Sequence, residues 1–86
     1  MPARYCVTPE EEIFLELRLR LAEGLKARRV RKNLTQVELA KALNSSQSRV
    51  AKMEAGDPTV SMDLLVRSLL ALGASDRDLA KIIAPR

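Results

Sequence analysis

Residues 34–56 decide how this chain folds, and they read LTQVELAKALNSSQSRVAKMEAG. Two helix starts lie within this stretch. Thr35, with Glu38 three residues later, forms a capping box that begins one helix, and Ser45 or Ser46 offers a capping hydroxyl for a second. Asn44 lies between the two, and asparagine tolerates the left-handed backbone of a tight turn after a helix. The stretch therefore predicts two short helices joined by a turn of three or four residues.

The second of these helices, expected over residues 47–55 and closed by Gly56, has one apolar side and one polar side. Leu43, Val50 and Met53 are placed to be buried beneath the pair. Four polar side chains are left to face outward: Gln47, Ser48, Arg49 and Lys52. A helix pair whose second member is basic and polar on its outer side is the helix-turn-helix pattern, which reads the major groove of DNA. The alternative is a polar surface helix of an ordinary bundle.

A long first helix is predicted on the N-terminal side of this pair. Thr8 begins it with a second capping box, and it is expected to run to about Lys32. Its apolar stripe consists of Ile13, Phe14, Leu17, Leu21, Leu25 and Val30. Gly24 lies inside this helix and weakens it locally, so a kink or a break there is the alternative to a continuous helix. Asn33 follows the helix end, where a left-handed residue is expected.

Two shorter helices are predicted on the C-terminal side. Ser61 caps a helix that runs through Leu72 and stops at Gly73, and Ser75 begins another that ends before Pro85. The chain has no strand pattern and no internal repeat. Five helices with short connections predict an all-α fold, folded as a single compact domain.

Positive charge is concentrated around the predicted helix pair. The 86 residues carry a net charge of +4. Residues 25–52 hold eight basic residues and one acidic residue, whereas residues 1–24 hold three basic and five acidic residues. This concentration suits a polyanion such as DNA, the alternative being a solvated basic face. Tyr5 and Phe14 are the only aromatic residues, so the chain has no aromatic platform for stacking unpaired bases.

Composition argues against several other functions. The chain has no histidine and a single cysteine, Cys6, which excludes an internal disulfide and a cysteine–histidine zinc site. It has no glycine-rich phosphate loop and no nucleophile with a base beside it, so we expect no enzyme, no metal and no cofactor. Residues 1–9 lack the apolar core of a signal peptide, and no apolar run has membrane-spanning length. A soluble, cytoplasmic protein is expected.

Residues 34–40 and 46–56 resemble the helix-turn-helix of the Xre family, whose members share the five-helix domain of the phage repressors. The resemblance is clear over residues 25–72 and looser beyond them. It implies a lambda-repressor-like DNA-binding domain in residues 25–86, with residues 1–24 as an N-terminal extension and the start of an extended first helix. It also implies a transcriptional regulator, in the first place a repressor, that binds double-stranded DNA as a homodimer.

The resemblance assigns roles to individual polar residues. Base contacts are expected from Gln47, Ser48, Arg49 and Lys52. Phosphate contacts are expected from Lys32, Thr35, Gln36, Ser46 and Thr59. Gln47 is the first candidate base reader, because its amide can bond bidentately to adenine, and it is also expected to pair with Gln36. Arg49 and Lys52 remain assigned to either a base or a phosphate.

Members of this family pair an arginine of the first helix with a glutamate that ends the recognition helix, and Arg29 and Glu54 match those positions. The resemblance therefore implies a structural ion pair, with a phosphate contact from Arg29 as the alternative. In the loop after Gly56, Asp57 and Pro58 stand where many relatives have lysine or arginine. This departure puts phosphate contacts from that loop in doubt.

Two apolar segments are candidates for protein contacts. Leu79, Ile82 and Ile83 of the last helix are expected to form the dimer contact, by analogy with phage repressors, or else to belong to the core. Residues 8–24 are acidic, yet they carry more apolar side chains than a free extension should. They are expected to pack on the domain or on a second copy, and the alternative is a grip on a toxin or other partner protein. In that alternative the chain is an antitoxin that also represses its own operon.

Overall fold

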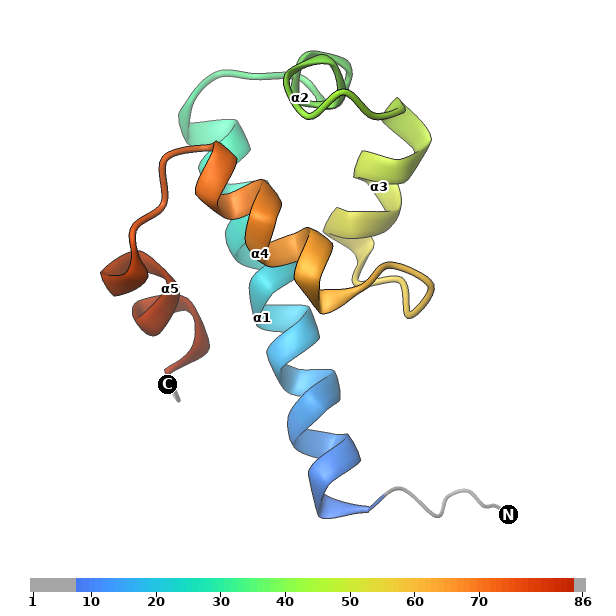
Figure 1. Ribbon diagram of the computed structural model, residues 1–86, viewed down its shortest axis with the longest axis vertical. Helices are drawn as coiled ribbons and strands as arrows, with labels where there is room; N and C mark the ends of the chain where they lie inside the picture. The colour runs from blue at the N-terminus through green and yellow to red at the C-terminus, as the bar shows by residue number, and fades with distance from the viewer. Residues whose placement is uncertain (1–7, 85–86) are drawn as a thin grey trace.

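The computed structural model describes residues 8–84, and within this range the chain forms five α-helices and no strand. The helices are α1 (Pro9–Arg31), α2 (Gln36–Ala42), α3 (Gln47–Ala55), α4 (Met62–Ala71) and α5 (Asp76–Ile83). Figure 1 shows α1 along the length of the molecule, with α4 lying across it and α3 and α5 on either side. The expected all-α, five-helix architecture is confirmed. Cys6 and Pro85 lie outside the described residues.

Each helix begins at the capping residue that the sequence predicts. The N-caps are Thr8, Thr35, Ser46, Ser61 and Ser75, and each side chain accepts a hydrogen bond from the backbone N–H three residues later. In α1, α2 and α5 the carboxylate of that third residue accepts a hydrogen bond from the backbone N–H of the N-cap residue, which completes a capping box. Asn33 and Asn44 have φ values of 59° and 55°, as expected just past a helix end. Local signals therefore fix the helix boundaries.

The capping carboxylates make the fold sensitive to acid. Hydrogen bonds from the backbone and side chain of the N-cap residue hold the pKa of Glu11, Glu38 and Asp78 below the ordinary carboxyl value. A pKa lowered in the folded state stabilises the fold fully above the ordinary value of about 4, and this stabilisation is lost as the pH falls through the lowered pKa. We therefore expect the free energy of unfolding, measured by urea denaturation, to fall below about pH 4.

Glu38→Gln should remove part of this acid-dependent fall. Glu10→Gln is the matched control. Glu10 is also an exposed carboxylate in the first turn of a helix, but it takes no part in a capping box. If the two variants show the same dependence of stability on pH, the capping carboxylates are not its cause.

The core is formed by side chains from α1 to α4. The largest of its completely buried apolar side chains are Leu25, Leu39, Val50, Met53, Leu65 and Leu69. Leu79 and Ile82 of α5 are partly buried against this core. Ile82 lies directly on Gly24, because a Cβ added at Gly24 would come within 2.8 Å of the Ile82 Cδ1 atom. Since α1 is continuous through Gly24, the glycine gives α5 room to approach and does not mark a break.

The apolar stripe predicted for α1 is buried only in the middle of the helix. Leu21 and Leu25 are buried, whereas Ile13, Phe14 and Val30 are 60%, 47% and 55% exposed. The prediction is wrong at the N-terminal end because α1 projects there beyond the other helices, as Figure 1 shows. It is wrong at Val30 because five residues after Leu25 is about 140° around the helix, away from the core. Val37, in the first turn of α2, is likewise 50% exposed.

Candidate nucleic-acid interface

A tight turn fixes the angle between α2 and α3. The backbone N–H groups of Ser45 and Asn44 donate to the carbonyl oxygens of Ala40 (2.8 Å) and Lys41 (3.1 Å), which is the bonding pattern of a Schellman motif. The left-handed backbone of Asn44 permits this pattern, and Ala40 is buried beside it. The predicted pair of short helices and its connecting turn are therefore present.

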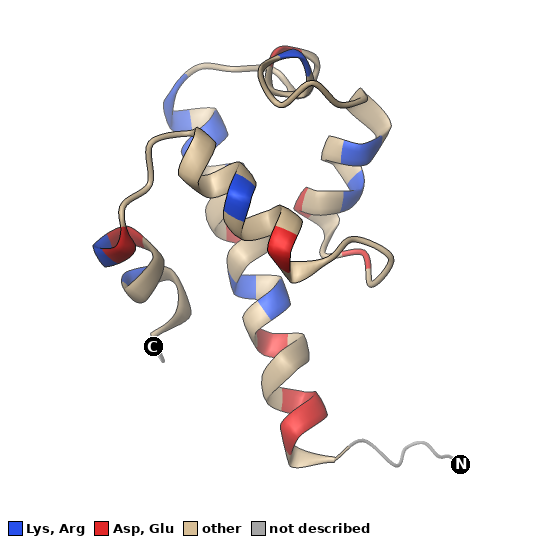
Figure 2. Ribbon diagram, viewed as in Figure 1, with Lys and Arg blue, Asp and Glu red and all other residues tan. Residues whose placement is uncertain are grey.

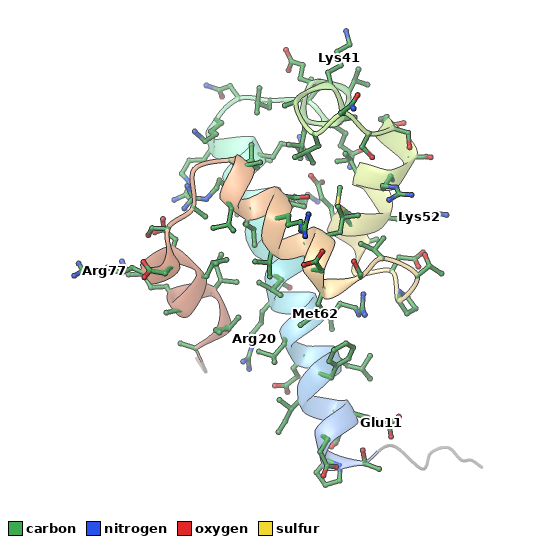
Figure 3. The ribbon with its side chains drawn as sticks, viewed as in Figure 1. Glu11, Arg20, Lys41, Lys52, Met62 and Arg77 are labelled. Atoms are coloured by element: carbon green, nitrogen blue, oxygen red, sulfur yellow. The ribbon has the colours of Figure 1, made fainter. Side chains whose placement is uncertain are left out.

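Helix α3 has one fully buried side and one exposed side. Val50 and Met53 have no exposed surface, which anchors α3 on the core. All four residues expected to contact bases are exposed: Gln47, Ser48, Arg49 and Lys52. In Figure 3 the side chain of Lys52 points away from the body of the molecule. The structure thus brings these four side chains together on the accessible part of α3.

A chain of side-chain hydrogen bonds connects the start of α3 to α2. The Nε2 group of Gln47 donates to Oε1 of Gln36 over 2.8 Å. The Nε2 group of Gln36 in turn donates to Oε1 of Glu54 over 3.1 Å. The amide of Gln47 is therefore held in place although its residue is exposed. A held side chain loses less conformational freedom when it binds a ligand.

Arg29 and Glu54 form an ion pair at the inner end of this chain. The Nε and Nη2 groups of Arg29 donate to the two carboxylate oxygens of Glu54 over 2.5 and 3.1 Å. The Nη1 group donates to the carbonyl oxygen of Leu34 over 2.7 Å. The side chains of Arg29 and Glu54 are only 12% and 4% exposed, and the hydrogen bonds with Glu54 raise the pKa of Arg29 above its ordinary value. All three guanidinium nitrogens therefore have partners inside the protein.

A polar hollow of about 340 Å³ lies between α3 and the start of α4. Its polar lining residues are Ser46, Ser48, Arg49, Lys52, Thr59 and Ser61. Hydroxyl groups and two cations, with no acidic side chain among the lining residues, suit an anion such as a phosphate. Ser46 and Ser61 use only their oxygens for capping, so their hydroxyl protons are free to be donated.

Thr59 is held differently from the two serines. Its backbone N–H and its hydroxyl both donate to the carboxylate of Asp57, over 2.8 and 2.6 Å. These two bonds lower the pKa of Asp57. Because the hydroxyl proton of Thr59 is already donated, the side chain keeps only acceptor lone pairs, which a phosphate cannot use. Asp57 thus occupies the hydroxyl donor with which Thr59 was expected to contact a phosphate.

Arg18 holds the same loop from beneath, and sequence reasoning missed it. The residue is 6% exposed, and its Nη1 group donates to the backbone carbonyl oxygens of Asp57 and Val60. The ring of Phe14, 5.2 Å from the guanidinium carbon, lies over it. The available signal was spacing, because Arg18 lies four and seven residues before the buried Ala22 and Leu25 and so shares their face. Arg18 therefore fixes the loop that follows α3.

The charges of the described residues are distributed unevenly. Figure 2 shows acidic residues along the N-terminal half of α1 and basic residues at its C-terminal end and on α3. Lys32 and Thr35 are exposed between α1 and α2, on the basic side of this division. No helix between residues 8 and 84 combines the length and apolar character needed to cross a membrane. In the same part of the chain, no three potential metal-ligating side chains group together.

A family model described as helix-turn-helix matches residues 25–82. The comparisons with curated proteins and with solved structures gave no match. The matched segment contains α2, α3, α4, the C-terminal part of α1 and nearly all of α5, and so it includes every residue of the interface except Arg18 and Phe14. The resemblance seen in the sequence is thus confirmed over two thirds of the chain. This chain belongs to the Xre and lambda repressor-like helix-turn-helix family of DNA-binding transcription regulators.

Proposed function

We propose that the chain is a sequence-specific repressor that lays α3 in the major groove of DNA. The observation that carries the proposal is the exposed polar face of α3, with Gln47 held at its leading end by Gln36. A side-chain amide offers the donor and the acceptor that the major-groove edge of adenine requires. Ser48 and Arg49 lie beside Gln47, and Lys52 lies one turn further along, within reach of a guanine or a phosphate.

Phosphate contacts are assigned to donors that remain free around α2 and α3. Gln36 uses one N–H toward Glu54 and keeps the other. Ser46 accepts a capping bond through oxygen and keeps its hydroxyl proton. The side chain of Thr35 also bonds the Glu38 carboxylate, so its hydroxyl has to turn away from Glu38 to donate to a phosphate. Lys32 adds an exposed positive charge at the end of α1. Such contacts set the register of the protein on the duplex and make the affinity depend on salt.

We further propose that two copies bind one two-fold symmetric operator. A single recognition helix reads only a few base pairs, and two-fold pairing spaces the half-sites by about 34–36 Å. The proposed contact lies on α5. Ile83 is 40% exposed and is available for it, whereas Leu79 and Ile82 are already engaged with the core.

Replacing Gln47 by alanine is expected to relax sequence preference. The measurement is fluorescence anisotropy on the duplex upstream of the chain's own gene and on a scrambled duplex, each at several salt concentrations. Loss of a bidentate base contact should reduce the preference for the upstream duplex by about 1–3 kcal/mol. Lys52→Ala should weaken binding, whereas Arg77→Ala, which removes the same charge from α5, should not, because Arg77 points away from α3 in Figure 3. Equal, weak binding of both duplexes by the wild-type chain would refute the proposal.

A second function, binding of a partner protein, is favoured by the projecting part of α1. Ile13, Leu15 and Leu19 are 60%, 46% and 52% exposed, so the described domain does not cover this segment. Apolar side chains left exposed together, with glutamates around them, are typical of a protein contact. On this proposal the projecting part of α1 binds a toxin protein, and the chain acts as an antitoxin that represses its own operon.

The test of this second function is co-expression with the product of the adjacent gene. Ile13→Glu combined with Leu15→Glu is expected to abolish a complex between the two proteins and to leave affinity for the upstream duplex unchanged. The control is Leu70→Glu, which places the same charge on an exposed leucine of α4. A double variant that loses DNA affinity together with the complex, or keeps both, would contradict the assignment of the contact to α1.

A further inference from the structure

The hydrogen-bond chain that ends at Gln47 has a fixed direction. It begins at the ion pair of Arg29 and Glu54, where a carboxylate oxygen accepts from both Arg29 and Gln36. A carboxylate can only accept hydrogen bonds, whereas a side-chain amide donates from its nitrogen and accepts at its oxygen. The direction of every later bond in the chain therefore follows from the charge state of its first member.

Two steps carry this direction to the surface. Because Glu54 must accept, Gln36 has to turn its NH2 group inward and its oxygen toward Gln47. Because that oxygen can only accept, Gln47 has to turn its own NH2 group toward Gln36. Gln47 then presents its oxygen and its second N–H outward, and no donor within residues 8–84 reaches that oxygen.

We propose that Glu54 is a positioning residue for base recognition, which fixes the donor–acceptor order of the Gln47 amide and thereby selects adenine over guanine. Adenine presents a donor at N6 and an acceptor at N7, which match one amide oxygen and one N–H. Guanine presents two acceptors, O6 and N7, and would need both N–H groups of a reversed amide. The inference rests on the proposed reading of bases by α3.

Glu54→Gln tests the inference because it changes one oxygen into an NH2 group at nearly constant shape. A glutamine at this position can direct either its oxygen or its nitrogen toward Gln36. In the second case every bond of the chain reverses, and Gln47 presents two N–H donors outward. The variant should therefore bind adenine and guanine duplexes more nearly alike, with the largest relative gain on guanine.

The experiment uses the full chain and duplexes chosen by the wild-type protein from a random library. The position read by Gln47 is the one where Gln47→Ala loses its base preference. At that position the wild-type chain is expected to bind adenine about tenfold more tightly than guanine. Glu54→Gln should reduce this ratio to about threefold or less. Asp78→Asn is the matched control, because it makes the same carboxyl-to-amide change in the Arg28–Asp78 ion pair and should leave the ratio unchanged.

A second variant keeps the test valid if Glu54→Gln fails to fold. Gln36→Met cuts the chain at its middle member and leaves the Arg29–Glu54 ion pair in place. It should weaken binding to both duplexes by loss of a phosphate contact and should also lower the adenine-to-guanine ratio. An unchanged adenine-to-guanine ratio in Gln36→Met, or a wild-type preference for guanine at the Gln47 position, overturns this inference but leaves the proposed base reading by α3 intact. A wild-type chain that selects no sequence overturns the proposed base reading and the inference with it.

Discussion

Arg29→Ala is expected to lower the free energy of unfolding by about 3–5 kcal/mol, because it leaves a buried carboxylate without its partner. The Glu54 side chain is 4% exposed, and two of its hydrogen bonds come from Arg29. The same variant removes the donor to the Leu34 carbonyl oxygen. Urea denaturation at pH 7, followed by circular dichroism, measures the loss. It is large for a domain of this size, whose total stability is about 5–15 kcal/mol.

Arg67→Ala is the matched control for this prediction. Arg67 forms an ion pair with Asp63 over 3.0 Å, but the two side chains are 75% and 71% exposed. An exposed pair of this kind contributes under about 1 kcal/mol. If both variants lose the same small amount of stability, the Arg29–Glu54 pair is not the structural element that its burial indicates.

Leu69→Ala is expected to lower the free energy of unfolding by about 2–5 kcal/mol, since it opens a cavity among fully packed side chains. Leu69 is completely buried in α4, whereas its neighbour Leu70 is 49% exposed. Leu70→Ala removes the same atoms from the same helix one residue later, and it should cost less than about 1 kcal/mol. Equal losses in the two variants would contradict the placement of α4 on the core.

The helix boundaries could be predicted because their causes are local. A capping hydroxyl, a carboxylate three residues later and an asparagine past the helix end act within one turn of backbone. Thr35, Ser46 and Asn44 therefore have the conformations that the sequence predicts. The choice of side for α3 was also local, because Val50 and Met53 are the only large apolar residues inside it.

Burial along α1 could not be predicted in the same way. Whether Ile13 is covered depends on where α4 and α5 end, and those elements come more than 30 residues later in the chain. Val30 is a different case, because its position about 140° from Leu25 follows from helical spacing. Helical spacing places Arg18 on the face of Ala22 and Leu25, but its partners could not be predicted, because they are carbonyl oxygens 39 and 42 residues away.

The candidate interface contains features that could be predicted from local sequence and features that could not. The outward set on α3 followed from helical spacing, and the pairing of Gln36 with Gln47 was expected from the family resemblance. The sequence did not reveal that Asp57 takes the hydroxyl proton of Thr59, because the two side chains meet only through the shape of the loop. The direction of the bonds from Glu54 outward also required the positions of individual atoms.

The projection of α1 beyond the other helices means that one helix contains two regimes of local unfolding. All residues from Pro9 to Glu16 are exposed, so no core burial holds the first two turns. They keep their backbone hydrogen bonds, the Thr8 capping box, and the contacts of Phe14 with Arg18 and of Glu16 with Arg20. Opening these turns exposes no buried core side chain. Their amide hydrogens should therefore exchange with solvent at the low opening free energies of a fraying helix end. Amides near Leu21 and Leu25 exchange only when α3 and α4 separate from α1, which is the unfolding of the whole domain. A single continuous helix thus spans nearly the full range of opening free energies that this fold can have.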